Sequence, residues 1–588
     1  MDAQALRLRG RTRPRPLPPY RRAPADSARP RIEGDGLLGV GHALEARRRH
    51  LRLVPPLSGT DPPRVRRDRR RGRIRHRRRV PVRRRDPARS AVAHRALSRR
   101  RASCTAPRDG RRPPAVGGDA ADGGARQDAV SGANRAAGLL VAIAVALACA
   151  GCTRRDAPTG TPYARVAAPV ALVVVDGLDA RDVAGDMPEL TRAWRESAWC
   201  PGAHGRAAMP ARTNVNHATL ATGVYPEMHG ITGNVFWART ADPPRKLGAA
   251  ADFLTETVFT VAAAHDPPLR TALAVGKPKL ELMFAATAAG HAVPDDVWSP
   301  KDAPSSGRDA ATGYATDAAT LAGARRLLEN GPAFVLVNLA DVDRVSHAAG
   351  PHSGEAQATR RATDRELAAF VHDVLARPGW REGTIVVTAD HGFDATTHPA
   401  IDVGAMLRDA GLADAFVVVP DGGVAHVYTR ETPRAAATTL KAARQRALAQ
   451  EGVAEALYRA FNREDDWYDH MIDHVHPDWH VVNVRTGDLL LVTAPGYTFA
   501  ASDGEDAHLR GNHGAPAETD VPVVALGGVA SGDHCDEIHA ADVGRTVLGC
   551  LGLPDVARLD GGPIPPQSQG RVLRGLCKTA IATAVPTP

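Results

Sequence analysis

Four short apolar runs, rich in Val and Leu, constrain the fold of this chain more than any other feature. They span residues 169–177, 333–341, 384–392 and 521–528. Their apolar residues do not alternate strictly with polar ones, which is typical of strands buried on both faces of a sheet. Segments with helical patterning separate them, for example 318–328, 354–376 and 433–460. Strands that alternate with helices predict a layered α/β/α fold around a mostly parallel central sheet.

Carboxylates and imidazoles gather at the ends of three of these predicted strands and just ahead of the fourth. They are Asp176, Asp343, His347, Asp390, His391 and His513. In an open α/β sheet, ligands bind beyond the carboxyl ends of the strands. Asp and His side chains suit zinc, and about six of them are enough for two metal ions. Each residue alone fits the ordinary role of a helix cap at a strand end.

Thr213 precedes a stretch of small residues that predicts the start of a helix. A helix N-terminus favours an anion, so a threonine alkoxide and a bound phosphate would both be stabilised there. These residue types favour Thr213 as a nucleophile beside the predicted metal site. The alternative is that Thr213 or Asn214 only caps the helix.

The segments described so far resemble the alkaline phosphatase superfamily, and most closely its type I phosphodiesterase/nucleotide pyrophosphatase branch. That family typically has P-T-x-T-x-P-N-H-x-T-L-x-T-G-x-Y-P-x-x-H-G-I, where this chain reads PARTNVNHATLATGVYPEMHGI from Pro210 onward. Ala211 and Val215 depart from the pattern, but neither position supplies a metal ligand, and the nucleophile position is intact. The matching segments occur in the family's order from about residue 168 to 530.

The resemblance implies a phosphoester hydrolase with two divalent metal ions, zinc being the expected metal. It assigns one metal to Asp343, His347 and His513, and the other to Asp176, Asp390, His391 and the Thr213 oxygen. It also implies that Asn234 binds a phosphoryl oxygen. Thr213 would attack phosphorus to form a covalent phosphothreonine, which water would then hydrolyse. The sequence does not favour a sulfatase, because Cys200-Pro201-Gly202 does not match the motif that is converted to formylglycine.

Lys277 and Lys279 form a Lys-x-Lys-Leu motif after a further predicted strand. This motif is similar to one in phosphonoacetate hydrolases, and some secreted monoesterases have a comparable Lys-x-Arg. A monoester or phosphonate dianion carries one more negative charge than a diester and gains more from cationic donors. The substrate is therefore left open between a diester, a monoester and a phosphonate. The alternative is a pair of solvated lysines, although residues 131–588 contain only six Lys.

Residues 1–129 differ in kind from the rest of the chain. The first 130 residues hold 36 Arg, no Lys and only 12 acidic residues, whereas the remainder holds 40 basic and 53 acidic residues. A segment with this much charge and without Phe or Trp cannot bury enough apolar surface to fold. It is therefore expected to be disordered. We interpret it as sequence upstream of a start codon assigned too early. The alternative is a nucleic-acid-binding arm, but no such motif is present and no nucleic-acid partner is expected.

Residues 130–152 read as a bacterial signal peptide. Arg135 precedes an apolar stretch, 136–150, that is shorter than the ~20 residues of a membrane span. Ala150-Gly151-Cys152 resembles the end of a lipobox, with Cys149 as its departure. These features predict an extracytoplasmic protein, lipid-anchored to a membrane through Cys152 or otherwise secreted.

The remaining sequence is predicted to be a linker, 153–166, and a catalytic domain, 167–588, with a segment inserted at about 400–510. Four histidines fall in that insertion: His470, His474, His476 and His480. They indicate a solvent-facing insertion, with a third metal site as the alternative. The resemblance to the superfamily implies that such an insertion shapes the substrate entrance. Four cysteines after Cys152 allow three pairings if all form disulfides, and they are Cys200, Cys535, Cys550 and Cys577. The sequence sets no oligomeric state.

Overall fold

The computed structural model describes residues 163, 166, 168–239, 241–459, 467–532 and 535–578. The predicted disordered segment 1–129 and the predicted signal peptide 130–152, with its lipidation residue Cys152, lie outside the described residues. So does nearly all of the predicted linker 153–166. Within the described part of the chain, no helix is long and apolar enough to span a membrane.

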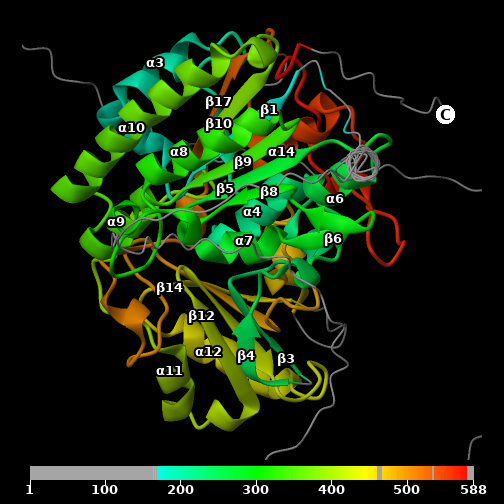
Figure 1. Ribbon diagram of the computed structural model, residues 1–588. Helices are drawn as coiled ribbons and strands as arrows, with labels where there is room; N and C mark the ends of the chain where they lie inside the picture. The colour runs from blue at the N-terminus through cyan, green and yellow to red at the C-terminus, as the bar shows by residue number, and fades with distance from the viewer. Residues whose placement is uncertain are drawn as a thin grey trace, which may run out of the picture. The chain divides into compact units, whose positions relative to one another are not determined.

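An eight-stranded mixed sheet forms the centre of the fold (Figure 1), with strand order β18-β2-β17-β10-β1-β9-β5-β8. The strands are β1 (Val170–Val175), β2 (His204–Arg206), β5 (Thr271–Val275), β8 (Asp296–Trp298), β9 (Phe334–Leu339), β10 (Thr384–Thr388), β17 (Asp520–Gly527) and β18 (Ile538–His539). Strands β10, β1, β9, β5 and β8 pair in parallel, and β17 runs antiparallel to its neighbours β10 and β2. The predicted layered fold with a mostly parallel sheet is confirmed.

Both faces of this sheet are buried, which explains why its strands read as continuous apolar runs. Val170, Leu172 and Val174 of β1 pack into one core, while Ala171, Val173 and Val175 pack into the other. The first face is covered by α4 (Thr213–Thr222), α6 (Val258–Ala264), α7 (Pro278–Phe284) and α14 (Ala540–Cys550). The second is covered by α2 (Ala180–Asp186), α3 (Pro188–Glu196), α8 (Asp317–Leu327) and α10 (Gly354–Leu375).

The segment 400–510 contains a second, antiparallel sheet with the order β12-β13-β15-β14 (Figure 1). Its strands are β12 (Phe416–Asp421), β13 (Val424–Thr429), β14 (Val453–Tyr458) and β15 (Leu489–Thr493), and helices α11 (Val403–Asp409) and α12 (Ala437–Leu448) pack against it. The predicted helix over 433–460 is wrong in its second half. The chain turns at Gly452, whose φ is +86°, and continues as β14, which pairs with β15.

Smaller elements complete the described chain. Two-stranded pairs are β3 (Val235–Ala238) with β4 (Ala241–Lys246), β6 (Ala286–Ala288) with β7 (His291–Val293), and β11 (Asp394–Ala395) with β16 (Gly511–Asn512). Further helices are α5 (Pro226–His229), α9 (Asp341–Ala349) and α13 (Ile472–Val475).

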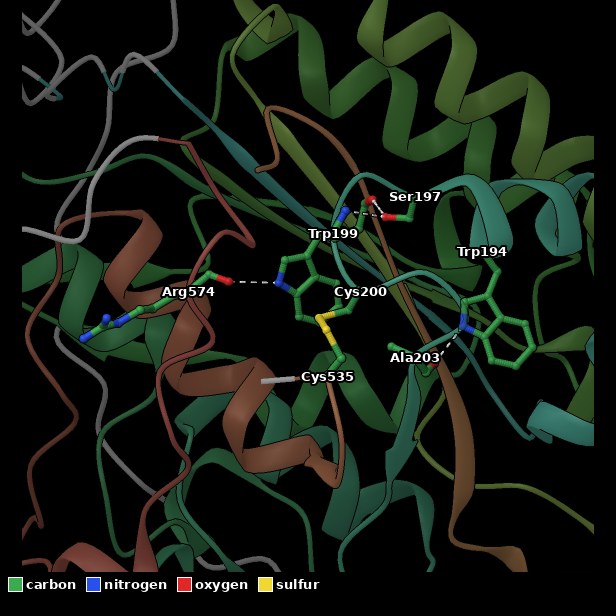
Figure 2. The surroundings of a disulfide bond; sticks show 8 residues. Trp194, Ser197, Trp199, Cys200, Ala203, Cys535 and Arg574 are labelled. Atoms are coloured by element: carbon green, nitrogen blue, oxygen red, sulfur yellow. Dashed lines mark hydrogen bonds between the residues drawn. A yellow bond between two sulfur atoms is a disulfide. The ribbon is translucent and has the colours of Figure 1, made fainter. Parts of the chain in front are cut away.

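Two disulfides link the four cysteines of the catalytic region, Cys200 with Cys535 and Cys550 with Cys577. Figure 2 shows the first beside Trp199, whose indole N–H donates to the Arg574 carbonyl oxygen at 3.0 Å. Trp199 is 1% exposed, so the disulfide joins the loop that carries this buried side chain to the C-terminal segment. Disulfides form and persist in oxidising compartments, which indicates an extracytoplasmic location.

Replacing Cys200 and Cys535 together by Ser is expected to lower the free energy of unfolding by about 2–5 kcal/mol, because their cross-link closes a long loop in the unfolded chain. The two residues are 335 positions apart in sequence, against 27 for Cys550 and Cys577. The matched Cys550→Ser/Cys577→Ser variant should therefore lose less stability. Urea unfolding under oxidising conditions measures both values. Equal stability of wild type and the Cys200/Cys535 variant would contradict the prediction.

Candidate active site

The carboxyl ends of four adjacent parallel strands bring the chemically active side chains together. Asp176 follows β1, Asp390 lies two residues beyond β10, and Lys277 lies two residues beyond β5. Strand β9 leads into α9, whose residues Asp343 and His347 lie one helical turn apart. These strands are neighbours in the order β10-β1-β9-β5, so the side chains converge at one edge of the sheet.

Helix α4 places Thr213 at its first residue, where backbone N–H groups have no helical partner. The threonine is 1% exposed. Its Oγ1 lies 3.4 Å from His391 Nε2 and 3.5 Å from Lys277 Nζ. Arg212 is the N-cap of the helix, so the capping role that the sequence left open for Thr213 or Asn214 is wrong.

Asp343 is the centre of the first predicted ligand set. Its Oδ1 lies 3.5 Å from His347 Nε2 and 3.6 Å from His513 Nε2. The second set surrounds His391, whose Nε2 lies 3.4 Å from Asp390 Oδ2 and 3.6 Å from Asp176 Oδ1. His391 Nε2 is farther, 4.0 Å, from Asp343 Oδ1, although its ring stacks on that of His513.

Three observations indicate that these two groups of side chains could bind divalent metal ions. Tetrahedral zinc with ligand bonds of about 2.0–2.1 Å separates its ligand atoms by roughly 3.3–3.4 Å, close to the separations above. Asp343 Oδ1 and Asp390 Oδ2 are buried oxygens without a well-formed hydrogen bond in the described chain. His217 Nδ1 lies 3.3 Å from Asp390 Oδ2 but is closer, at 2.9 Å, to the Thr213 carbonyl oxygen. Such orphaned acceptors are rare, and a bound ion would satisfy them.

The histidines supply the third observation, since each has its Nδ1 at a backbone carbonyl. His347 bonds Gly511 at 3.0 Å, His391 bonds Gly392 at 2.9 Å and His513 bonds Ala211 at 2.7 Å. This fixes the tautomer and leaves each Nε2 lone pair facing the site. Burial lowers the pKa of all three imidazoles, that of His391 to about 4, so they are neutral and able to bind a metal at neutral pH.

Sequence reasoning did not assign roles to His217 and Asn338, which the structure places in the same cluster. His217 lies with Asp176 and Asp390 in a group with metal-ligand spacing. However, its Nδ1 contacts the Thr213 carbonyl at 2.9 Å and its Nε2 lies 3.2 Å from Asn338 Nδ2, so both ring nitrogens have partners. Asn338 also donates to Asp176 Oδ2 at 2.8 Å. His217 Nδ1 is also 3.3 Å from Asp390 Oδ2, so each of the two residues contacts one carboxylate of the second set and can orient it. In the sequence, Asn338 could have been singled out as the one polar residue within an otherwise apolar strand.

Lys277 is buried within the carboxylate cluster. Its Nζ lies 2.8 Å from Asp176 Oδ1 and 2.7 Å from Asp343 Oδ2. Burial opposes its charge, but the two carboxylates raise the pKa of Lys277. In turn, burial acts to raise the pKa of Asp343, yet the adjacent Lys277 charge holds it well below its usual range. Lys277 thus uses one Asp343 oxygen and leaves Oδ1, the oxygen that faces the histidines, without a partner.

Lys279 lies on the first turn of α7 and is only partly exposed. Burial, and then the neighbouring Lys277 charge, lower the pKa of Lys279 to about 8. No described carboxylate forms an ion pair with it, and its strongest electrostatic neighbours are site residues. Lys277 therefore lies among the carboxylates of the site, and Lys279 is half-buried on the adjacent helical turn.

Asn234 lies beside the N-terminus of α4. One end of its side-chain amide is 3.3 Å from the Asn214 backbone nitrogen. The other end faces Arg212, at 3.0 Å from Nη2 and 3.3 Å from Nε. A guanidinium has only donors, so the amide oxygen faces Arg212 and the amide NH2 lies next to the Asn214 N–H. The two N–H groups thus lie side by side near Thr213.

The histidines of the 400–510 segment do not form a third metal cluster among the described residues. His474, His476 and His480 each lie near a different carboxylate, of Asp469, Glu455 and Glu227 respectively. The groups with metal-ligand spacing in the described chain are those at the strand ends, Asp343 with His391 and His513, and Asp176 with His217 and Asp390.

Comparisons with known proteins agree with the fold and identify the family. A profile of the family described as Type I phosphodiesterase / nucleotide pyrophosphatase matches residues 170–516, more than half of the chain. The murine ectonucleotide pyrophosphatase/phosphodiesterase 5, solved as an inactive variant with AMP, has a TM-score of 0.51 and 15% identity, over 66% of this chain and 96% of that one. Its human counterpart has a TM-score of 0.51 and 16% identity, over 66% and 95% of the two chains.

Phosphonoacetate hydrolase from Sinorhizobium meliloti 1021, solved with phosphonoacetate, has a TM-score of 0.49 and 22% identity, over 66% of this chain and 97% of that one. No curated protein sequence matches the chain. The α/β fold and the family match define a phosphoester hydrolase of the alkaline phosphatase superfamily. The chain belongs to the type I phosphodiesterase/nucleotide pyrophosphatase family.

Proposed function

We propose that the protein hydrolyses phosphoesters through a covalent phosphothreonine at Thr213. The observation that carries this proposal is the position of the Thr213 hydroxyl, buried at the start of α4 and 3.4 Å from His391 of the second ligand set. A nucleophile needs a group that activates it within reach and a site that accepts the phosphoryl charge. The N-terminus of α4 supplies such an anion site.

Two divalent metal ions, zinc by their ligand types, fit the two sets. Asp343, His347 and His513 would hold one ion, and Asp176, Asp390, His391 and the Thr213 oxygen would hold the other. When bound, such ions lower the pKa of a coordinated hydroxyl and neutralise charge on phosphoryl oxygens.

The proposed reaction consists of two successive displacements at phosphorus. Thr213 releases its hydroxyl proton to solvent and attacks phosphorus. The bond to the leaving oxygen breaks, and this oxygen departs with its electron pair and takes up a proton from solvent. Thr213 then carries the phosphoryl group, still esterified to the retained alcohol if the substrate is a diester. Water attacks the same phosphorus and the bond to Thr213 breaks, which consumes one water and regenerates the hydroxyl. The Asn214 N–H and the Asn234 amide donate to an equatorial oxygen throughout.

A second candidate, hydrolysis of a phosphomonoester or a phosphonate, is favoured by the two lysines. Lys279 lacks an ion-pair partner among the described carboxylates and lies where an additional substrate charge would be neutralised. Comparing kcat/KM on bis-p-nitrophenyl phosphate, p-nitrophenyl phosphate and phosphonoacetate, with zinc supplied, distinguishes the two candidates. A preference for the diester supports the nucleotide pyrophosphatase-type activity, and a preference for a dianion supports the second candidate.

Lys279→Met is expected to lower kcat/KM for p-nitrophenyl phosphate by about tenfold and to affect the diester much less, since a charge-assisted hydrogen bond contributes about 1.5–3 kcal/mol. Because the pKa of Lys279 is lowered to about 8, its charge is present below that pH and is lost above it. The wild-type kcat/KM for the monoester should therefore fall above about pH 8 relative to that for the diester. A monoester/diester ratio that does not change with pH, or in Lys279→Met, would refute this role; Lys301→Met, an exposed lysine, is the control.

We further propose that the mature protein begins at a lipidated Cys152 and works outside the cytoplasm, with residues 153–166 as its linker and 167–588 as its catalytic domain. The segment 400–510 would be an insertion that shapes the substrate entrance. The two disulfides support the compartment. Mass spectrometry of the mature N-terminus tests the anchor. A terminus far upstream of Cys152 would contradict it and would favour a role for the Arg-rich segment.

A further inference from the structure

A β-hairpin of the second sheet reaches the catalytic centre. Its strands β12 and β13 are joined by the two-residue turn Gly422-Gly423. Gly422 has φ +68°, and a Cβ there would lie 2.1 Å from the His513 carbonyl oxygen and 2.4 Å from Arg212 Nη1. Only glycine fits so close an approach in this backbone conformation. The Gly423 N–H donates to the same His513 carbonyl at 3.0 Å.

The last residue of β12, Asp421, is 4% exposed and forms an ion pair with Arg212. Arg212 Nε lies 2.8 Å from Asp421 Oδ1. The other carboxylate oxygen, Oδ2, accepts from the Asn234 backbone N–H at 2.8 Å. One carboxylate therefore connects the residue before Thr213 to the residue proposed to bind a phosphoryl oxygen.

The donors of the Arg212 guanidinium are used by groups of the protein. Besides Asp421, Nη1 donates to the His513 carbonyl at 2.9 Å and lies 3.3 Å from Asn512 Oδ1. Nη2 faces the Asn234 amide oxygen at 3.0 Å. Four of the five N–H donors of the Arg212 guanidinium are thus used by protein groups, so Arg212 supports its neighbours before any contact with substrate.

We infer that Asp421 is a positioning residue, acting through Arg212 and Asn234 to hold the phosphoryl-binding amide beside the N-terminus of α4. This inference rests on the proposed function. An N–H group that stabilises a transition state must be fixed before the reaction, and its misplacement by about 1 Å can cost roughly 100-fold in rate. The second sheet thus contributes to catalysis through the tip of its hairpin, in addition to any role at the substrate entrance.

A double-mutant cycle between Asp421→Asn and Asn234→Ala tests the inference, with kcat and KM measured on the best substrate among the three above. Asp421→Asn keeps the size of the side chain but removes its charge, and it should lower kcat about 10–100-fold with little change in KM. Asn234→Ala should lower kcat about 100–1,000-fold. If Asp421 acts through Asn234, the double variant should be little slower than Asn234→Ala alone.

Asp488→Asn is the matched control for unfolding or metal loss. Asp488 is also a buried aspartate of the second sheet, but its partners in the described chain are Arg239, Arg459 and Thr429 and not residues of the site. The Asp488→Asn variant should keep kcat within about twofold of the wild-type value. Arg212→Lys keeps the positive charge but loses the planar guanidinium with its several N–H donors. It should lower kcat as Asp421→Asn does and show the same coupling to Asn234→Ala.

If the losses of kcat in the two single variants multiply in the double variant, the inference is overturned. An Asp421→Asn variant with wild-type kcat would overturn it as well. So would an equal loss in Asp488→Asn, because the effect would then be one of general stability. Thr213→Ala, measured alongside, reports on the proposed function separately. If Thr213→Ala is active, the mechanism fails; if it is inactive while Asp421 and Asn234 act independently, only the inference about Asp421 fails.

Discussion

Thr213→Ala is expected to lower kcat by about 10,000-fold, since removal of a nucleophile leaves only the contribution of binding and charge stabilisation. The hydroxyl is the reacting group in the proposed mechanism and lies 3.4 Å from His391 Nε2. The remaining ligands form contacts that do not depend on it, so the variant should fold and retain most of its metal. Steady-state rates, metal content by elemental analysis and the thermal midpoint together measure the effect.

Two variants control this result. Thr222→Ala removes the same atoms from the other end of α4, where the hydroxyl donates to the Ala218 carbonyl at 2.8 Å, and it should retain nearly full activity. Thr213→Ser keeps a hydroxyl and should retain a substantial fraction of the rate. A Thr213→Ala variant that turns over at the wild-type rate would refute Thr213 as the nucleophile.

Removal of divalent metal by a chelator is expected to lower kcat at least about 1,000-fold, because the charge neutralisation at the phosphoryl group is then lost. Dialysis into excess zinc should restore the rate. The apoprotein should also unfold at a lower temperature, since it retains the buried oxygens Asp343 Oδ1 and Asp390 Oδ2 without partners.

Asp343→Asn sharpens the metal prediction. It keeps the size of the side chain but removes the charge that faces His347 and His513. About one metal ion per chain should be lost, with the rate falling as far as in the chelated wild type. Full activity in a metal-free preparation would contradict the two-metal account. Titration with zinc, manganese and iron identifies the metal that restores most activity.

The parallel strands and their terminal residues were predictable from the sequence because both signals are local. A buried parallel strand must be apolar throughout, and a residue that follows it must lie at the ligand-binding edge. Asp176, Asp343 and Asp390 therefore converge in the structure as the sequence predicts. The stretch of small residues after Thr213 likewise predicted the helix that presents it.

Other features depend on contacts between distant segments, which local patterns do not specify. Helical patterning in the sequence continues through residue 460, but the structure has the antiparallel strand β14 after α12. The pairing of β14 with β15 stabilises the strand over the helix. The contact of Asp421 with Arg212 spans more than 200 residues and joins a hairpin turn to the nucleophile helix. Nothing beside Asp421 in the sequence marks it as part of the site. The disulfide pairing was likewise open among three combinations until the cysteines were placed in space.

The steric course at phosphorus tests the central claim most directly. A substrate made chiral at phosphorus with oxygen isotopes or sulfur is hydrolysed by the wild-type enzyme, and the configuration of the product is determined by phosphorus NMR. Two in-line displacements, first by Thr213 and then by water, predict net retention of configuration. Net inversion would mean that water attacks the substrate in a single displacement, and it would contradict the covalent intermediate at Thr213.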